Sequence, residues 1–355
     1  MPTDPEAGAR TRETWPDVAK GVCIVLVVLW HVVTKHYQQV DWNTSLPVSA
    51  AWGTLGEQLL PLRMPLFFTI SGVFALGTVG RPWRVILRGR VATLLYVYAL
   101  WLLIHTTIMW FTPDFDTARA RDLSDLVEQL TITPTNLWYL YALALYVVIA
   151  RATMRVPTTW LLIGSFVLSA VAAAALLPAP SNRGQVYQNL FFFLLGLRLR
   201  PRVETWAREA NARRLVGWGG ALVVGSAAMA AAGAQRWQGV WPAVSVLAVA
   251  FGVTAAAMLA RTTGRVARGL DGLGRRTLPI YVIHLPLLAV VDLLLRGPLN
   301  VLEPRGTALA IVEPAVLTAV VLATCLALDR GLRRIGLRWL FERPTARRRP
   351  SAHPA

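Results

Sequence analysis

A lysine and a histidine flank one apolar run near the start of the chain. Lys20 precedes the ten residues GVCIVLVVLW, and His31 follows them. Eleven residues of α-helix return to within about 20° of the starting direction and rise about 16 Å, so both side chains are expected on one helix face. Imidazole exchanges protons near neutral pH, and an ionisable group in an apolar segment is costly to place there. The pair therefore predicts a buried base with a cationic anchor at the other end of its helix.

The composition places this helix in a membrane protein. Hydrophobic residue types make up 55% of the 355 residues and charged types 15%, and the mean hydropathy is +0.48. A membrane-spanning helix needs about 20 apolar residues. Apolar runs of that order centre on 18–33, 59–79, 91–111, 136–150, 159–177, 186–199, 213–233, 241–260, 278–296 and 308–328. We predict an all-α, polytopic integral membrane bundle of about ten transmembrane helices.

The distribution of lysine and arginine predicts the orientation of the bundle. If both termini are cytoplasmic, 28 of the 36 Lys and Arg fall on the inner side of the membrane, as the positive-inside rule requires. The net charge of +17 then reflects orientation and attraction to anionic lipids, for which Arg347, Arg348 and Arg349 are the expected contacts. We predict membrane lipids and no nucleic acid as partners, because no soluble basic module with interleaved aromatic residues is present.

One membrane domain is predicted, with a tail at each end. The tails cover 1–16 and 341–355, the second basic and disordered, and the ten-helix domain covers 17–340. Cys23 and Cys325 lie in apolar runs, without the spacing of a zinc site or a disulfide framework. We interpret them as packing residues and predict no metal.

The longest outer loop, at 112–135, carries an amphipathic pattern. Leu123, Leu126, Val127 and Leu130 recur at helical spacing, which predicts a short helix on the outer surface. It would serve as a lid over a site or as a plain connector.

Six segments spread along most of the chain form an ordered set. They are WPDVAKGVCIVLVVLWHVV at 15–33, MPLFFTISGVFA at 64–75, the arginines of 81–90 before LLYVY, NLWYLYAL at 136–143, FFFLLGLRLR at 191–200 and LPIYVIHLPLL at 278–288. Each segment alone is mostly apolar and weakly specific. In this order, on ten predicted spans, they resemble the motifs of the membrane acyltransferase-3 family.

The resemblance implies transfer of an acyl group, usually acetyl from acetyl-CoA, to a hydroxyl of a carbohydrate or other acceptor. His31 is then expected to be the general base or acyl-transfer residue, since attack by a weakly acidic hydroxyl needs a base. Lys20, Arg84, Arg88 and Arg90 are expected to bind the donor's phosphates on the cytoplasmic side. Acyl-CoA is a co-substrate here, and no tightly bound cofactor is expected.

Two positions depart from the family's pattern. Lys20 stands where arginine is common, and Arg63 stands where a histidine often precedes Met-Pro. Lysine is a point charge without arginine's planar fork, so the geometry at the donor phosphates is expected to differ while binding is kept. No esterase-like domain is fused to the membrane unit, which is expected to complete the transfer alone or to hand the acyl group to a separate protein.

Five further residues are candidates for lining the site. Asp17 belongs to the first motif, and Ser71, beside Gly72, either lines the site or permits close helix approach. Trp138 is either an interfacial anchor or a surface on which an acceptor sugar stacks. Tyr281 and His284 share a helix face expected near the cytoplasmic end, where they line the donor entry or are satisfied core groups.

The resulting hypothesis is a multi-pass enzyme of a bacterial plasma membrane. It moves an acyl group from cytoplasmic acyl-CoA to a hydroxyl of a cell-envelope carbohydrate or glycolipid. The alternative is a transporter or proton-coupled permease in which His31 relays protons. The ordered motifs favour the enzyme, as does the lack of visible inverted repeats.

Overall fold

The computed structural model describes residues 13–344 except 43, 45, 116, 118 and 302–306. Every regular element in these residues is helical, which confirms the predicted all-α fold class. The α-helices are α1 (Trp15–Lys35), α2 (Val48–Gln58), α3 (Leu60–Val79), α4 (Trp83–Ile86), α5 (Ala92–Trp110), α6 (Leu123–Thr131), α7 (Trp138–Ala152), α8 (Thr158–Ala173), α9 (Arg183–Arg198), α10 (Arg200–Arg208), α11 (Ala212–Ala231), α12 (Val240–Ala260), α13 (Arg265–Gly274), α14 (Thr277–Val301) and α15 (Thr307–Arg334). The lipid contacts predicted at Arg347, Arg348 and Arg349 lie outside the described residues.

Each predicted apolar run is occupied by a helix, but the helices differ in length. By length and composition, seven helical segments in the described part of the chain can cross a membrane: Trp15–Gln39, Val48–Val79, Trp83–Trp110, Ala212–Ala231, Val240–Ala260, Thr277–Asn300 and Thr307–Arg334. The other three, α7, α8 and α9, have 15 or 16 residues, which is short against the roughly 20 that a span needs. The count of ten spans and the cytoplasmic termini therefore stay predictions.

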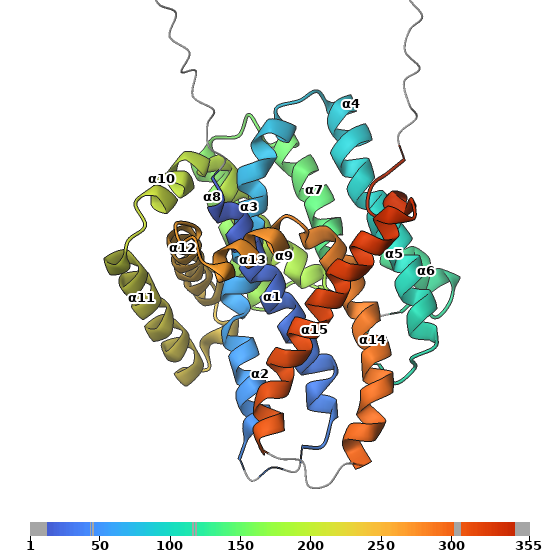
Figure 1. Ribbon diagram of the computed structural model, residues 1–355. Coiled ribbons are helices and arrows are strands. Elements are labelled where there is room, and N and C mark those ends of the chain that lie inside the picture. Colours follow the sequence, from blue (N-terminus) through green and yellow to red (C-terminus); the bar gives the residue numbers. More distant parts are fainter. Residues whose placement is uncertain are drawn as a thin grey trace, which may run out of the picture.

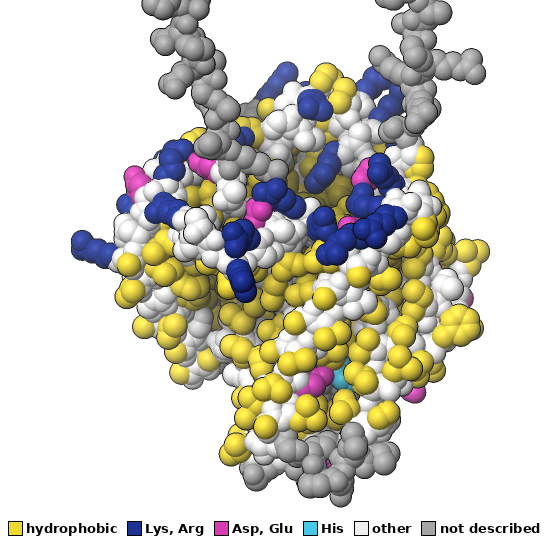
Figure 2. Space-filling model, in the orientation of Figure 1, with side chains coloured by type: hydrophobic (Ala, Val, Ile, Leu, Met, Phe, Trp, Pro, Cys, Tyr) yellow, Lys and Arg dark blue, Asp and Glu magenta, His cyan; other side chains and the backbone are white. Residues whose placement is uncertain are grey.

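Helix α1 runs through the middle of the bundle (Figure 1) and contacts α3, α12, α13, α14 and α15. Lysine and arginine side chains gather at one end of the molecule, at the top of Figure 2, above a broad hydrophobic zone. We call this the basic end. Helix α1 begins near it and runs toward the opposite end.

Pairs of glycines allow two of the closest helix contacts. A Cβ on Gly72 of α3 would collide with the carbonyl oxygen of Phe193 in α9, and one on Gly196 of α9 would collide with that of Thr69. Helices α1 and α13 meet in the same way, because Gly274 faces the carbonyl oxygen of Asp17. Without a hydrophobic driving force in lipid, helices depend on such close backbone packing.

Charged residues hold the far end of α1 in place. His36, fully buried, lies 2.8 Å through Nδ1 from Oδ1 of Asp292 in α14, and 3.4 Å through Nε2 from Oε1 of Glu313 in α15. Arg296 binds the same Asp292 at 2.8 Å. Because buried charges are stable only when they are paired, this cluster fixes α1 against α14 and α15.

The amphipathic helix expected in the long loop is present as α6. Leu126 and Leu130 pack against the main hydrophobic core, whereas Leu123 and Val127 are exposed. The hydroxyl of Tyr98 in α5 donates to the carbonyl oxygen of Gln129 at 2.5 Å. This helix is therefore tied to α5.

The glycine contact between α3 and α9 gives a test of the packing. Gly72→Val should lower the stability by about 1–3 kcal/mol, because the side chain must push two backbones apart. The measurement is thermal unfolding of the purified protein in detergent, followed by tryptophan fluorescence. Gly77→Val on the same helix is the matched control, since nothing lies within 4 Å of a Cβ at Gly77. Equal losses in the two variants would contradict the packing argument.

Candidate functional site

Two histidines from distant parts of the chain meet inside the bundle. Nδ1 of His31 in α1 lies 3.1 Å from Nε2 of His284 in α14, and their ring centroids are 5.0 Å apart. Nδ1 of His284 faces the carbonyl oxygen of Ile280 at 3.1 Å. A carbonyl only accepts, so neutral His284 donates through Nδ1 and accepts through Nε2. His31 then donates through Nδ1, which leaves the lone pair of its Nε2 available to take a proton.

A cavity of about 320 Å³ opens beside His31, which we call the His31 cavity. Amide, aromatic and cationic side chains supply most of its polar surface. The lining residues are Val27, Trp30, His31, Lys35, Leu60, Arg63, Met64, Asn136, Trp138, Asn182, Gln185 and Tyr281. These groups can donate and accept hydrogen bonds and offer flat apolar faces, which suits a ligand rich in hydroxyl groups.

A second cavity of about 320 Å³ lies around Lys20, which we call the Lys20 cavity. It is lined by Lys20, Ser71, Phe74, Ala75, Thr78, Arg90, Tyr139, Leu143, Val147, Phe193 and Thr277. Lys20 forms an ion pair with the buried carboxylate of Asp17 at 2.7 Å and lies over the ring of Phe74 at 4.8 Å. The unbroken helix α1 thus connects a cation in one cavity with a base in the other.

Of the arginines predicted beside Lys20, the structure brings only Arg90 into its cavity. Arg90 belongs to a π-helical turn, Leu87–Val91, between α4 and α5. Arg84 and Arg88 are exposed and are not among the residues that line the Lys20 cavity. The carbonyl of Arg88 instead accepts a hydrogen bond from Arg343 at 3.1 Å.

Aromatic side chains separate the two cavities. The ring of Tyr139 packs against Phe67 at 4.7 Å and against Tyr281 at 5.5 Å between centroids. Ser71 donates to the carbonyl of Phe67, so the hydroxyl of Tyr139 donates to Ser71 Oγ, at 2.8 Å. The hydroxyl of Tyr281 donates to the carbonyl of Asn136 at 2.7 Å and accepts from the amide of Tyr139 at 3.2 Å. We call Phe67, Tyr139 and Tyr281 the aromatic partition.

Tyr281 and His284, expected to line a donor entry, lie beside the His31 cavity and do not line the Lys20 cavity. Tyr281 lines the His31 cavity and His284 contacts His31. The reason is that α13 precedes α14 and packs against α1, so α14 already begins at the level of the Lys20 cavity, with Thr277. One helical turn later, Tyr281 forms part of the partition and lines the His31 cavity.

The other predicted residues divide between the two cavities. Ser71 lines the Lys20 cavity and Trp138 lines the His31 cavity. Asp17 reaches the site only through its ion pair with Lys20. Spacing and motifs point only weakly to the remaining polar lining of the His31 cavity, which is Lys35, Arg63, Asn136, Asn182 and Gln185. Asn136 lay inside a motif, and Arg63 stood out as a departure from the family pattern.

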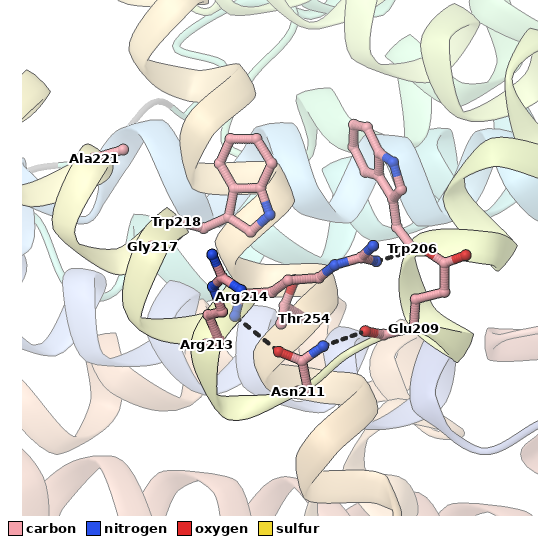
Figure 3. Close-up of a pocket in the computed structure, with 9 residues that line it drawn as sticks. All are labelled: Trp206, Glu209, Asn211, Arg213, Arg214, Gly217, Trp218, Ala221 and Thr254. Atoms are coloured by element: carbon pink, nitrogen blue, oxygen red, sulfur yellow. Dashed lines mark hydrogen bonds and ion pairs between the residues drawn. The ribbon is translucent and has the colours of Figure 1, made fainter.

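Another cavity, away from His31 and Lys20, has different chemistry. Its volume is about 620 Å³, and it is formed by the residues labelled in Figure 3, which come from α10, α11, α12 and the turn before α11. Arg214 is bound there by Glu209 at 2.5 Å, and its backbone amide is capped by Asn211. None of the residues that line it is a histidine, cysteine or lysine. Glu209, the one carboxylate in its described lining, is paired with Arg214, whereas the His31 cavity offers an imidazole.

Comparison with known proteins places the chain among acyltransferases. A family model described as an acyltransferase domain matches residues 13–330. The chain is also similar to the inner membrane protein YcfT of Escherichia coli (strain K12), with 28% identity over 58% of this chain and 61% of that protein. The aligned part thus spans less than two thirds of that relative. No solved structure matches.

Thiol labelling tests whether the two cavities open at opposite ends. Cys23 and Cys325 are both buried, so the parent chain should react little with a membrane-impermeant maleimide. We expect Thr78→Cys, in the Lys20 cavity, to react in inside-out vesicles, and Gln185→Cys, in the His31 cavity, to react in right-side-out vesicles. The measurement is the mass shift of the labelled protein. Labelling of both variants from the same side would contradict a two-sided site.

Proposed function

The chain belongs to the acyltransferase-3 family of membrane proteins, and from that premise we propose that it is an O-acyltransferase with His31 as its general base. Its donor is acyl-CoA, acetyl-CoA by preference, and its acceptor is a hydroxyl of a cell-envelope carbohydrate or glycolipid. One observation carries the proposal. A single unbroken helix presents Lys20 to one cavity and His31 to another, with a partition of side chains between them.

The base step follows from the hydrogen bonds of the two histidines. Because His31 donates through Nδ1 to His284, its Nε2 accepts the proton of the acceptor hydroxyl as the oxygen attacks the thioester carbonyl. The tetrahedral intermediate collapses when the carbon–sulfur bond breaks, and the imidazolium returns the proton to the leaving thiolate. His284 orients the ring and stabilises its positive charge, as a hydrogen-bonded partner does in other base-catalysed acyl transfers.

The Lys20 cavity fits the donor. Lys20 and Arg90 supply two cations for the nucleotide phosphates, and a charge-assisted contact to phosphate is stronger than a neutral hydrogen bond. Apolar side chains such as Phe74 and Phe193 line the rest of the cavity and suit the thin pantetheine arm. The axial distance from Lys20 to His31, about 16 Å for eleven residues of helix, is comparable to the extended length of that arm.

The His31 cavity fits a carbohydrate. The side chains of Asn136, Asn182 and Gln185 can bind hydroxyl groups in either sense. Trp138 lines the same cavity and offers an apolar face to a sugar ring. We propose that the basic end faces the cytoplasm of a bacterial cell, so that donor and acceptor enter from opposite sides of the plasma membrane.

Removal of the base tests the reaction. His31→Ala should lower turnover by 10²- to 10⁴-fold, the usual contribution of a general base. The measurement is release of free thiol from acetyl-CoA by purified protein with candidate acceptors. His105→Gln is the control, because His105 is also buried in the bundle but, among the described residues, its side chain hydrogen-bonds the carbonyl of Val282, at 2.8 Å, and does not contact His31. Substrate flux across liposomes without thioester consumption would favour the transporter instead.

The donor anchor gives a separate test. Lys20→Ala should raise the KM for acetyl-CoA by about tenfold, since it removes one charged contact to phosphate, while kcat changes less. Lys20→Arg should keep the KM within about threefold. Steady-state kinetics with varied acetyl-CoA measure both effects. Equal KM values in the parent protein and both variants would show that Lys20 does not bind the donor and serves only to orient the helix in the membrane.

A further inference from the structure

The guanidinium of Arg63 is buried beside His31, and none of the described residues forms an ion pair with it. Arg63 is only 6% exposed, yet in the described part of the chain its side chain makes no hydrogen bond and no ion pair. Buried charges are normally paired or bound to a ligand, because leaving one unpaired is strongly unfavourable. Its side chain lines the His31 cavity, so the missing partner has room to bind there.

The guanidinium is held in a way that leaves its hydrogen-bond donors free. It lies 4.8 Å from the ring centroid of Trp30, and this indole packs against Gly56 of α2. A cation–π contact uses the face of the guanidinium and not its N–H edges. Trp30 precedes His31 in α1, so the contact also ties the position of Arg63 to that of the proposed base.

The lysine and arginine side chains that line the cavity around Arg63 have no aspartate or glutamate beside them in its described lining. These side chains are Lys35 and Arg63. A buried guanidinium beside a cavity whose described lining holds no carboxylate favours an anion and disfavours a cation by charge complementarity.

We propose that the His31 cavity selects an acceptor sugar that carries an oxyanion, a carboxylate or a phosphate, and that Arg63 is the residue that binds it. That the bound sugar is the acceptor rests on the proposed function, whereas the anion site itself does not. The planar fork of arginine pairs with either group through two parallel N–H bonds. Anion binding by Arg63 would fix the sugar with one hydroxyl toward His31. Arg63 is thus a specificity-determining residue of this chain.

Binding without any donor tests the site directly. The probes are glucuronate, glucose 1-phosphate and glucose, titrated calorimetrically into the purified full-length protein in detergent. We expect at least one of the two anionic sugars to bind tenfold or more tightly than glucose. Arg63→Gln should reduce this preference to less than threefold, and Arg63→Lys, which keeps the charge, should retain part of it. Which of the two anions binds more tightly identifies the group.

The matched control is Arg121→Gln, because Arg121 is an exposed arginine outside the cavity, paired with Asp125 at 2.9 Å. It should leave the preference unchanged. Equal binding of charged and neutral sugars to the parent protein would overturn the proposal. So would an Arg63→Gln variant that keeps the preference for anions.

An assay of acyl transfer to charged and neutral acceptors distinguishes failure of this inference from failure of the proposed function. Anion-selective binding without acyl transfer would refute the enzyme and keep the site. Transfer at equal kcat/KM to charged and neutral acceptors would refute the site and keep the enzyme. If Arg63→Gln lowered transfer to both acceptors by the same factor, Arg63 would act on the reaction's own oxyanion, and acceptor selection would be refuted.

Discussion

The unbroken backbone hydrogen bonding of α1, from Trp15 to Lys35, sets the geometry of the whole site. A helix fixes the separation and direction of Lys20 and His31 as long as nothing interrupts it, and the described residues of α1 contain no proline after its first turn. The bundle holds this helix at both ends. Near the basic end Gly274 of α13 packs against the backbone of Asp17, and at the far end His36 binds Asp292 and Glu313.

Burial makes every polar group near α1 depend on a specific partner. In lipid an unsatisfied group has no water to bind, so the helices that surround α1 must supply the acceptors. His284 of α14 does this for His31, whereas Lys20 is paired within α1 itself, with Asp17. Arg63 differs from both, because its guanidinium lies over the indole of Trp30 and makes no hydrogen bond to any residue that the structure describes. The same rule that explains the paired groups therefore supports the proposal of a ligand at Arg63.

Local periodicity predicted the parts of the site that lie on one helix. The shared face of Lys20 and His31 and the amphipathic pattern of α6 follow from spacing alone. The partners across helices could not be predicted in this way. That His284 meets His31, 253 residues away, depends on where α13 sets the start of α14, and the amides of Asn182 and Gln185 reach the cavity only because α9 packs on α3. These positions are determined by tertiary packing, which a single apolar motif does not predict.

The aromatic partition places a condition on any reaction between the cavities. A thioester that enters beside Lys20 meets His31 only if the ring of Tyr139 moves, which breaks its hydrogen bond to Ser71 and its contacts with Phe67 and Tyr281. One hydrogen bond contributes about 1 kcal/mol net, and each aromatic contact contributes about 0.5–1.5 kcal/mol. The opening would therefore cost a few kcal/mol, which phosphate contacts of the proposed donor at Lys20 and Arg90 would have to offset. Because a closed partition keeps water at the basic end from reaching a thioester beside His31, coupling its opening to donor binding would also limit hydrolysis.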